Sequence, residues 1–165
     1  MKILITGGKS ALALKVLKAF AQHEVVLADY GEVPSFSAVN YKFISLGERN
    51  DDTIAHLLLN SCLDEVVDAV LPLQAFEILP VAKAQVLFAE FAIRTLLPNI
   101  EDLGIYFNAQ TAVKMADWVA FVDGDILFAT NSNTELITLG KNGRLNGIYY
   151  FNNNMPVANL MLFTI

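Results

Sequence analysis

A strand, a tight glycine turn, a helix and a second strand follow one another within about thirty residues at the start of the sequence. This order constrains the fold more than any other feature. The strands are the apolar runs Lys2–Thr6 and Glu24–Ala28, and Asp29 closes the second. Between them, Ser10 is placed to cap a helix over about 11–22, where apolar side chains recur at helical spacing. Such a βαβ unit predicts two parallel strands joined by a right-handed crossover.

The alternation of strands and helices continues to about residue 117. Further strands are expected at Tyr41–Leu46, Val66–Leu71 and Asp102–Phe107. Helices are expected over 53–62 with Asp51 or Asp52 as cap, from Pro80 to about Leu97, and from Asn108 through Asp117. Glu90 and Arg94 are spaced to pair across one turn of the long helix.

The sequence after residue 117 consists of short β-rich runs separated by turn residues, which is typical of antiparallel strands. The runs are Trp118–Val122, Ile126–Thr130, Glu135–Leu139, Gly147–Phe151 and Val157–Ile165. The predicted fold class is therefore α/β: a Rossmann-like parallel sheet with flanking helices over 1–117, followed by a β-rich C-terminal tail over 118–165. Because the last run carries almost no charge, we expect it to be buried against the α/β unit or in a homodimer.

Composition narrows the function classes. The chain of 165 residues is 55% hydrophobic and 17% charged, with a net charge of −6, which argues against nucleic acid and anionic membrane surfaces as partners. No apolar run approaches the roughly 18–20 residues that span a bilayer. The single Cys62 excludes an intramolecular disulfide and predicts a cytoplasmic protein. His23, His56 and Cys62 have no metal-ligand spacing, so no metal site is predicted.

The glycine turn matches the end of a phosphate-binding loop, because Gly8-Lys9-Ser10 reproduces its Gly-Lys-Ser. The first glycine of that motif would stand at Ile3, in the middle of the predicted strand. The loop that wraps the phosphates is therefore absent, and we expect no ATP hydrolysis. The backbone N–H groups of Gly8 to Ser10 are nevertheless expected to be able to hold an anion.

The same turn also resembles a dinucleotide fingerprint. The segment TGGKSALA is similar to the Thr-Gly-x-x-Gly-x-x-Gly form of short-chain epimerases and reductases, with Gly7 first, Ser10 at the second glycine and Ala13 at the third. Asp29 stands where an acid would accept a ribose hydroxyl. No Tyr-x-x-x-Lys pair follows. A degenerate NAD(P)-binding relative is one alternative that this pattern leaves open.

A longer stretch resembles another family. The segments VLADYGEVPSFSAVNYKFISL and DEVVDAVLPLQAFEILPVAKA look like the amino-terminal, pre-ATP-grasp domain of ATP-grasp ligases similar to the carbamoyl phosphate synthase large subunit. Leu71-Pro72-Leu73-Gln74 and Glu77 match the strand that ends in proline and the acidic helix start beside the ligand cleft of that domain. TAVKMADWVAF faintly resembles the helix leading into the ATP-binding part, with Val113 in place of its usual Asp. The resemblance implies a substrate-side domain without phosphoryl chemistry, because the remaining 48 residues cannot hold an ATP-grasp module.

These observations converge on one candidate site, since ligands of parallel sheets bind beyond the carboxyl ends of the strands. The predicted ligand-binding residues are Gly7, Gly8, Lys9, Ser10, Asp29, Pro72, Gln74 and Glu77. The leading expectation is a non-catalytic domain that binds a small-molecule ligand or a partner ligase chain, without a cofactor of its own. The alternatives are the NAD(P)-binding relative and a structural homodimer module.

Overall fold

The computed structural model describes residues 1–35, 37–107, 117–151 and 160–165, and they form two compact units. The first unit comprises residues 1–95 together with Ile165, and the second comprises residues 96–164. The division falls at residue 95, whereas the change in sequence character comes near residue 117.

The first unit contains a parallel five-stranded sheet with the order β3-β2-β1-β4-β5. Its strands are β1 (Lys2–Thr6), β2 (Glu24–Asp29), β3 (Tyr41–Ser45), β4 (Ala69–Leu71) and β5 (Arg94–Thr95). Residue Ile5 of β1 is in register with Leu27 of β2 and with Leu71 of β4. The chain therefore builds outward from β1 in one direction and then returns to its other side, which is the Rossmann-like arrangement predicted from the sequence.

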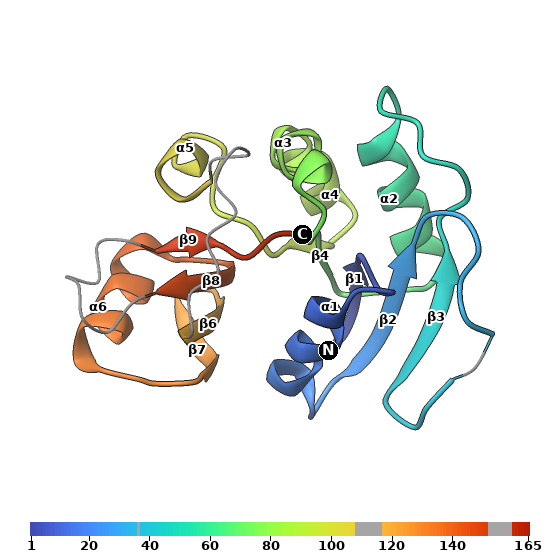
Figure 1. The fold of residues 1–165 in the computed structure, drawn as a ribbon. Coiled ribbons are helices and arrows are strands. Elements are labelled where there is room, and N and C mark those ends of the chain that lie inside the picture. The colour runs from blue at the N-terminus through green and yellow to red at the C-terminus, as the bar shows by residue number, and fades with distance from the viewer. Residues whose placement is uncertain (36, 108–116, 152–159) are drawn as a thin grey trace. The chain divides into compact units, whose positions relative to one another are not determined.

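Helices cover both faces of this sheet, with α1 on one face and α2 and α3 on the other (Figure 1). They are α1 (Ala11–Val16), the 3-10 turn η1 (Leu17–Phe20), α2 (Ile54–Asp64), α3 (Ala75–Lys83) and α4 (Gln85–Glu90). The two faces follow from right-handed crossovers, because the connections from β1 and from β3 run in opposite directions along the sheet. The central strands are consequently continuous apolar runs, and Ile3, Leu4 and Ile5 are fully buried.

The largest difference from the sequence prediction concerns the helix expected from Pro80 to Leu97. The helix α3 already begins at Ala75, and Pro80 lies inside it. Buried Ile78 and Val81 hold this helix against the sheet although Pro80 donates no backbone hydrogen bond. The helical path ends near Ala92, which adopts a φ of +58°. Arg94 consequently belongs to β5 and is not one helical turn from Glu90.

Smaller differences concern boundaries. The helix predicted over 11–22 continues as η1 after Val16, and α2 is capped at Thr53 rather than at Asp51 or Asp52. The strand predicted from Val66 begins only at Ala69, because Val66 has a φ of +51° that no strand residue adopts.

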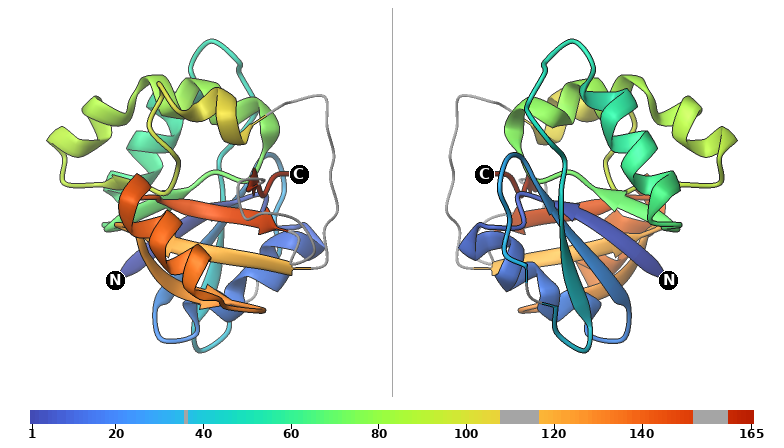
Figure 2. Two further views of the ribbon diagram at one scale, coloured as in Figure 1. Left: turned by 90° about the vertical axis from the view of Figure 1, so that its left-hand side faces the viewer. Right: turned by 90° about the vertical axis from the view of Figure 1, so that its right-hand side faces the viewer.

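The second unit contains an antiparallel four-stranded sheet with the order β7-β6-β8-β9. Its elements are α5 (Leu103–Tyr106), β6 (Asp117–Val122), β7 (Asp125–Ala129), α6 (Thr134–Gly143), β8 (Gly147–Phe151) and β9 (Met161–Leu162). A tight turn at Asp123 and Gly124, both with positive φ, joins β6 to β7 as the sequence predicted. Figure 2 shows α6 lying across these strands.

Two strand predictions in this unit are wrong. The run Glu135–Leu139 lies in α6, because Asn133 caps that helix by accepting a hydrogen bond from the Leu136 N–H at 2.8 Å. The run Asp102–Phe107 contains the short helix α5 instead of a strand. The helix predicted from Asn108 and residues 157–159 of the last run lie outside the described residues. Of that run, Leu160, Leu162 and Phe163 are buried as expected.

No helix among the described residues is long and apolar enough to cross a membrane.

Candidate functional site

The eight predicted site residues all belong to the first unit and lie at one edge of its sheet. Gly7 to Ser10 follow β1, Asp29 is the last residue of β2, and Pro72 and Gln74 follow β4. Glu77 lies in the first turn of α3. Because these strands are parallel and in register, their carboxyl ends meet where the strand order reverses between β1 and β4.

The glycine turn brings the chain from β1 close against β2. Gly7 has a φ of +66°, a conformation that glycine adopts without strain. A Cβ on Gly8 would lie 2.9 Å from the Cβ of Leu27 and 3.2 Å from the backbone nitrogen of Ala28. Glycine is therefore needed at position 8 for close packing of the turn on β2.

The backbone N–H groups of this turn donate hydrogen bonds within the protein. Gly8 donates to the carbonyl of Ala28 at 3.0 Å, and Ser10 donates to the carbonyl of Gly7 at 2.9 Å. Lys9 donates to Oδ2 of Asp29 at 2.9 Å. In this conformation each of these N–H groups has an acceptor inside the protein, and the expectation that they hold an anion stays a prediction.

Ser10 serves the helix rather than a ligand. Its Oγ accepts a hydrogen bond from the Ala13 N–H at 3.0 Å, which confirms the predicted cap of α1. Ser10 stands at the position of the second glycine of a dinucleotide fingerprint, and its Oγ is thus already engaged by the Ala13 N–H.

Asp29 joins the ends of β1 and β2. Its Oδ1 accepts a hydrogen bond from the N–H of Tyr30 at 2.8 Å, and its Oδ2 receives the Lys9 N–H. The Lys9 ammonium lies 3.9 Å from Oδ1 and donates to the carbonyls of Tyr30 and Glu32 at 2.8 and 3.2 Å. The Asp29 side chain is 10% exposed.

Glu77 is fully buried at the centre of a hydrogen-bond network. Its Oε2 accepts from the Thr6 hydroxyl and from the Gln74 N–H at 3.3 Å, and its Oε1 accepts from the Tyr30 hydroxyl at 2.9 Å. Thr6 in turn accepts from the Leu73 N–H at 2.8 Å. The network ties β1, β2 and the start of α3 together.

Sequence reasoning singled out Glu77 but missed Thr6 and Tyr30. The available signal was positional, because Thr6 ends β1 and Tyr30 directly follows Asp29. The pKa of Glu77 is raised to about 7, mainly by burial and to a lesser extent by the nearby Asp29 charge, whereas the hydrogen bonds from Thr6, Tyr30 and Gln74 lower it. Burial, followed by the charge of Glu77, raises the pKa of Tyr30 far above its ordinary value.

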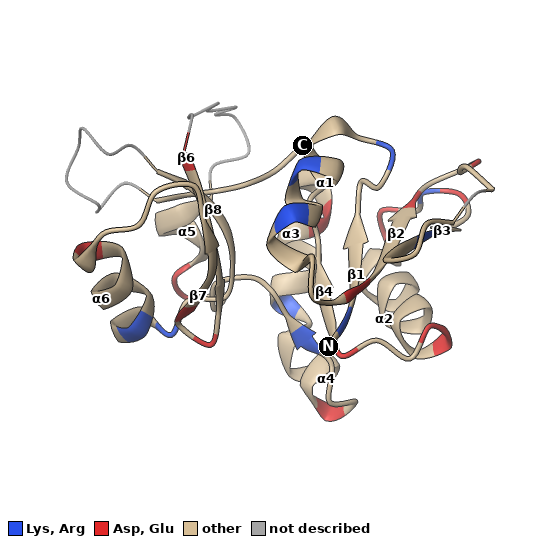
Figure 3. Cartoon of the chain, turned by 90° about the horizontal axis from the view of Figure 1, so that it is seen from below, with Lys and Arg blue, Asp and Glu red and all other residues tan. Residues whose placement is uncertain are grey.

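An aromatic cluster with one cation adjoins this network. The ring of Phe76 lies 5.6 Å from the ring of Tyr30, centroid to centroid. The Arg49 guanidinium carbon lies 3.6 Å from the centroid of the Phe76 ring, and the same side chain pairs with Asp51. Among the described residues, Lys, Arg, Asp and Glu occur in many separate segments of both units (Figure 3).

Ile165 covers the glycine turn. Its N–H donates to the carbonyl of Leu73 at 2.7 Å, and its carbonyl accepts from the Ala75 N–H at 3.1 Å. A Cβ on Gly7 would lie 2.5 Å from Cδ1 of Ile165, and 3.4 Å from Nε2 of Gln74. The space next to Gly7 is thus filled by the side chain of Ile165.

A dinucleotide fits only part of this arrangement. Asp29 is a suitable acceptor for ribose hydroxyls, since a carboxylate offers about four acceptor positions and backbone N–H groups take two. The pyrophosphate has no place in this conformation, because the turn N–H groups are bonded internally and Ile165 lies over Gly7. This conformation therefore offers an acceptor for a ribose but no cradle for the pyrophosphate of a nicotinamide dinucleotide.

Metal ligation has no support in the described part of the chain, where no three His, Cys, Asp or Glu side chains gather in a metal-binding group. Cys62 is buried on α2, and burial raises the pKa of its thiol to about 12. A thiol in that state is not a nucleophile at neutral pH.

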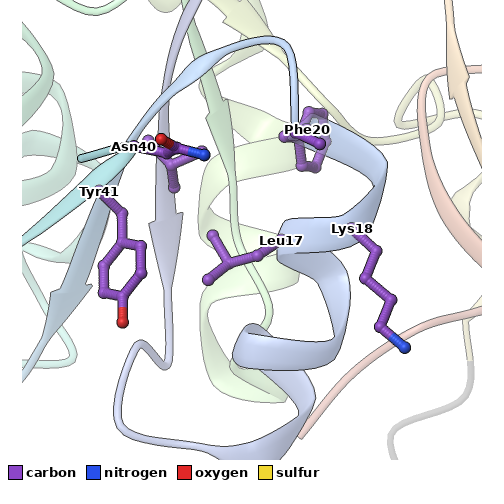
Figure 4. Close-up of a pocket in the computed structure, with 7 residues that line it drawn as sticks. Leu17, Lys18, Phe20, Asn40 and Tyr41 are labelled. Atoms are coloured by element: carbon purple, nitrogen blue, oxygen red, sulfur yellow. The ribbon is translucent and has the colours of Figure 1, made fainter. Parts of the chain in front are cut away.

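A hollow of about 250 Å³ lies at the opposite end of the sheet, beside the start of β2 and β3. Its lining is mainly apolar and includes Leu17, Phe20, Val25 and Tyr41, together with Asn40 and Lys18. Figure 4 shows the Lys18 side chain ending away from Leu17 and Tyr41. This hollow contains none of the predicted site residues.

No family model matches the sequence, and neither does any curated protein. Among solved structures, the chain is similar to dTDP-glucose 4,6-dehydratase from Bacillus anthracis str. Ames in complex with NAD, with 13% identity, 87% of this chain and 48% of that one covered, and a TM-score of 0.38. It is also similar to a short chain dehydrogenase family protein from Francisella tularensis subsp. tularensis SCHU S4, with 18% identity, 86% and 58% covered, and a TM-score of 0.37. A mutated uronate dehydrogenase has 11% identity, 85% and 50% covered, and a TM-score of 0.36. The chain spans about half the length of these proteins.

Proposed function

We propose that the protein is a non-catalytic binding module whose ligand carries a ribose-like pair of hydroxyl groups and enters at the carboxyl ends of β1, β2 and β4. The observation that carries this proposal is the position of Asp29. It ends β2, adjoins the glycine turn and retains unused acceptor capacity at the edge where the strand order reverses. A nucleoside is the simplest ligand with these features.

The state of Glu77 supports binding without catalysis. A general acid or base must reach the proton that it transfers, either directly or through one water molecule. Glu77 is fully buried, and both of its oxygens accept hydrogen bonds from Thr6, Tyr30 and Gln74. The group with the most suitable pKa is therefore engaged in holding the site together.

The glycine turn supports recognition through the ribose and base rather than through phosphate. The N–H groups of Gly8, Lys9 and Ser10 have acceptors inside the protein. Hydrogen bonds to a phosphate would have to replace these, so phosphate adds little to the net affinity.

We also expect no ATPase activity. Phosphate release above background that disappears in Lys9→Ala would contradict this expectation.

The test is calorimetric titration of the full chain with adenosine, with inosine, and with ribose alone. We expect adenosine to bind and Asp29→Ala to weaken its binding by about tenfold or more, because hydrogen bonds to a charged acceptor are lost. Asp29→Asn retains one oxygen acceptor and should bind with intermediate affinity. Asp125→Ala is the matched control, since Asp125 is exposed on β7 in the second unit.

Two results would contradict the proposal. One is the absence of binding by every ribose-containing ligand. The other is equal affinity for adenosine in Asp29→Ala and in the unchanged protein.

The resemblance to pre-ATP-grasp domains stays a prediction, as does a partner ligase chain. Pro72 follows β4 and Glu77 lies at the start of α3, in the order that this resemblance requires. The Glu77 side chain, however, bonds inward instead of facing a ligand. The homodimer also stays a prediction, which light scattering of the purified chain would test.

A further inference from the structure

We propose that the side chain of Ile165 blocks part of the ligand cleft. It fills the space beside Gly7 until a ligand displaces it. This inference rests on the proposed function, because it concerns access to the same site. It adds that one part of the site is regulated by the chain itself.

The position of Ile165 is the first argument. Its Cδ1 lies 2.5 Å from where a Cβ on Gly7 would stand, so the side chain rests directly on the glycine turn. In dinucleotide-binding parallel sheets, this turn is where the backbone approaches the pyrophosphate. Ile165 therefore fills the place beside Gly7, where the pyrophosphate of a ligand longer than a nucleoside would lie.

The way in which Ile165 is held is the second argument. Two backbone hydrogen bonds attach it to the segment between β4 and α3, one to the Leu73 carbonyl at 2.7 Å and one from the Ala75 N–H at 3.1 Å. These two residues flank Gln74, a predicted ligand-binding residue. Ile165 is therefore held at both its N–H and its carbonyl, on either side of a predicted ligand-binding residue.

The exposure of Ile165 is the third argument. The residue is 40% exposed, whereas Leu73, whose carbonyl accepts the Ile165 N–H, is fully buried. Displacing Ile165 therefore exposes little additional apolar surface and leaves the core of the sheet intact. A protein whose open form is a minor state binds its ligand more weakly, in proportion to the fraction that is open.

The test compares adenosine with ADP-ribose in the full chain. In Ile165→Ala, we expect the affinity for ADP-ribose to rise about fivefold and the affinity for adenosine to change by less than about twofold, because only the longer ligand must displace Ile165. Ile137→Ala on α6 is the matched control, since Ile137 is similarly exposed in the second unit. In the unchanged protein, ADP-ribose should accelerate hydrogen exchange of the Ile165 amide, whose acceptor is the Leu73 carbonyl.

An unchanged affinity for ADP-ribose in Ile165→Ala, or unchanged exchange of the Ile165 amide when ADP-ribose is bound, would overturn the inference. Failure of the proposed function is seen separately, as a lack of adenosine binding. In that case, binding of ADP-ribose by Ile165→Ala but not by the unchanged protein would still support the blocking role of Ile165. Absence of ADP-ribose binding in both proteins would overturn that role.

Discussion

Buried side chains pack against the parallel sheet of the first unit and against the antiparallel sheet of the second, but they differ in chemical type. Among the described residues, the buried polar and charged side chains are Thr6, Asp29 and Glu77, and all three stand at one edge of the parallel sheet. The antiparallel sheet is filled by aromatic rings instead. Its fully buried members include Trp118, Phe121, Tyr149, Phe151 and Phe163.

The two kinds of buried side chain respond differently to pH. Aromatic packing contributes through buried area and ring contacts, and it is insensitive to pH. A buried hydrogen-bonded carboxyl group stabilises only in one protonation state, and it gives its site a defined polarity. The contrast teaches that the buried polar chemistry of the described residues lies in the first unit, where the proposed site is.

The largest effect is expected in the aromatic sheet. Trp118 is 1% exposed, stacks on Phe128 at 4.6 Å between ring centroids, and lies 6.0 Å from the Phe163 ring. Trp118→Ala should lower the free energy of unfolding of the second unit by about 4 kcal/mol, through lost burial and a residual cavity. Urea denaturation followed by circular dichroism measures this. A loss below about 1 kcal/mol would mean that the rings do not form the core of that sheet.

The next effect is the pH dependence of the first unit. The pKa of Glu77 is raised from 4.5 to about 7 by burial, so between these values the folded protein holds a proton that the unfolded chain has released. Glu77 thus contributes stability that is complete below about pH 4.5 and is lost as the pH rises through 7. The contribution is on the order of 3 kcal/mol.

Glu77→Gln should remove this part of the pH dependence, because a glutamine side chain does not titrate. Denaturation midpoints measured from pH 4.5 to 8 in both proteins provide the comparison, with exposed Glu90→Gln as the control. The contrary result would be a free energy of unfolding that rises steadily over this pH range in the unchanged protein and rises with the same slope in Glu77→Gln. It would show that Glu77 is ionised throughout the range.

A smaller effect is expected where each unit depends on a close backbone approach. Gly8→Ala should destabilise the first unit by about 2 kcal/mol, because the new Cβ meets Leu27 and the backbone of Ala28. Gly140→Ala should act similarly in the second unit, where the Cβ would lie 2.6 Å from the carbonyl oxygen of Gly124. Gly104→Ala is the control, since open space surrounds that position. Equal melting temperatures for all three variants would contradict the prediction.

The smallest effect concerns one helix cap in each unit. Ser10 accepts a hydrogen bond from the Ala13 N–H at the start of α1, and Asn133 accepts one from the Leu136 N–H at the start of α6. Ser10→Ala and Asn133→Ala should each cost about 1 kcal/mol. Ser10→Asp should retain stability, since an aspartate also caps. A larger loss in Ser10→Ala than in Asn133→Ala would indicate that Ser10 also supports the glycine turn.

Much of the parallel sheet was predictable because its signals are local. The apolar runs of β1 and β2, the glycines between them and the Ser10 cap lie within one βαβ unit, and right-handed crossover then leaves few topologies. The same logic placed Gly7, Asp29 and Pro72 at one edge of the sheet. The second unit was less predictable, since the apolar spacing in Glu135–Leu139 suits a short strand as well as a helix.

The sequence by itself therefore determined the parallel sheet, the glycine turn and the acid at the end of β2, because each depends on residues close together in the chain. Only the tertiary structure decided how those residues are used. Thr6, Tyr30 and Glu77 are separated by 24 to 71 positions, and they form one network only because β1, β2 and α3 meet at the same edge. Likewise, Ile165 reaches Gly7 across almost the whole chain. Hydrogen bonds and contacts between distant residues leave no periodic pattern in the sequence, so the occupied turn and the buried carboxyl group became visible only in the folded protein.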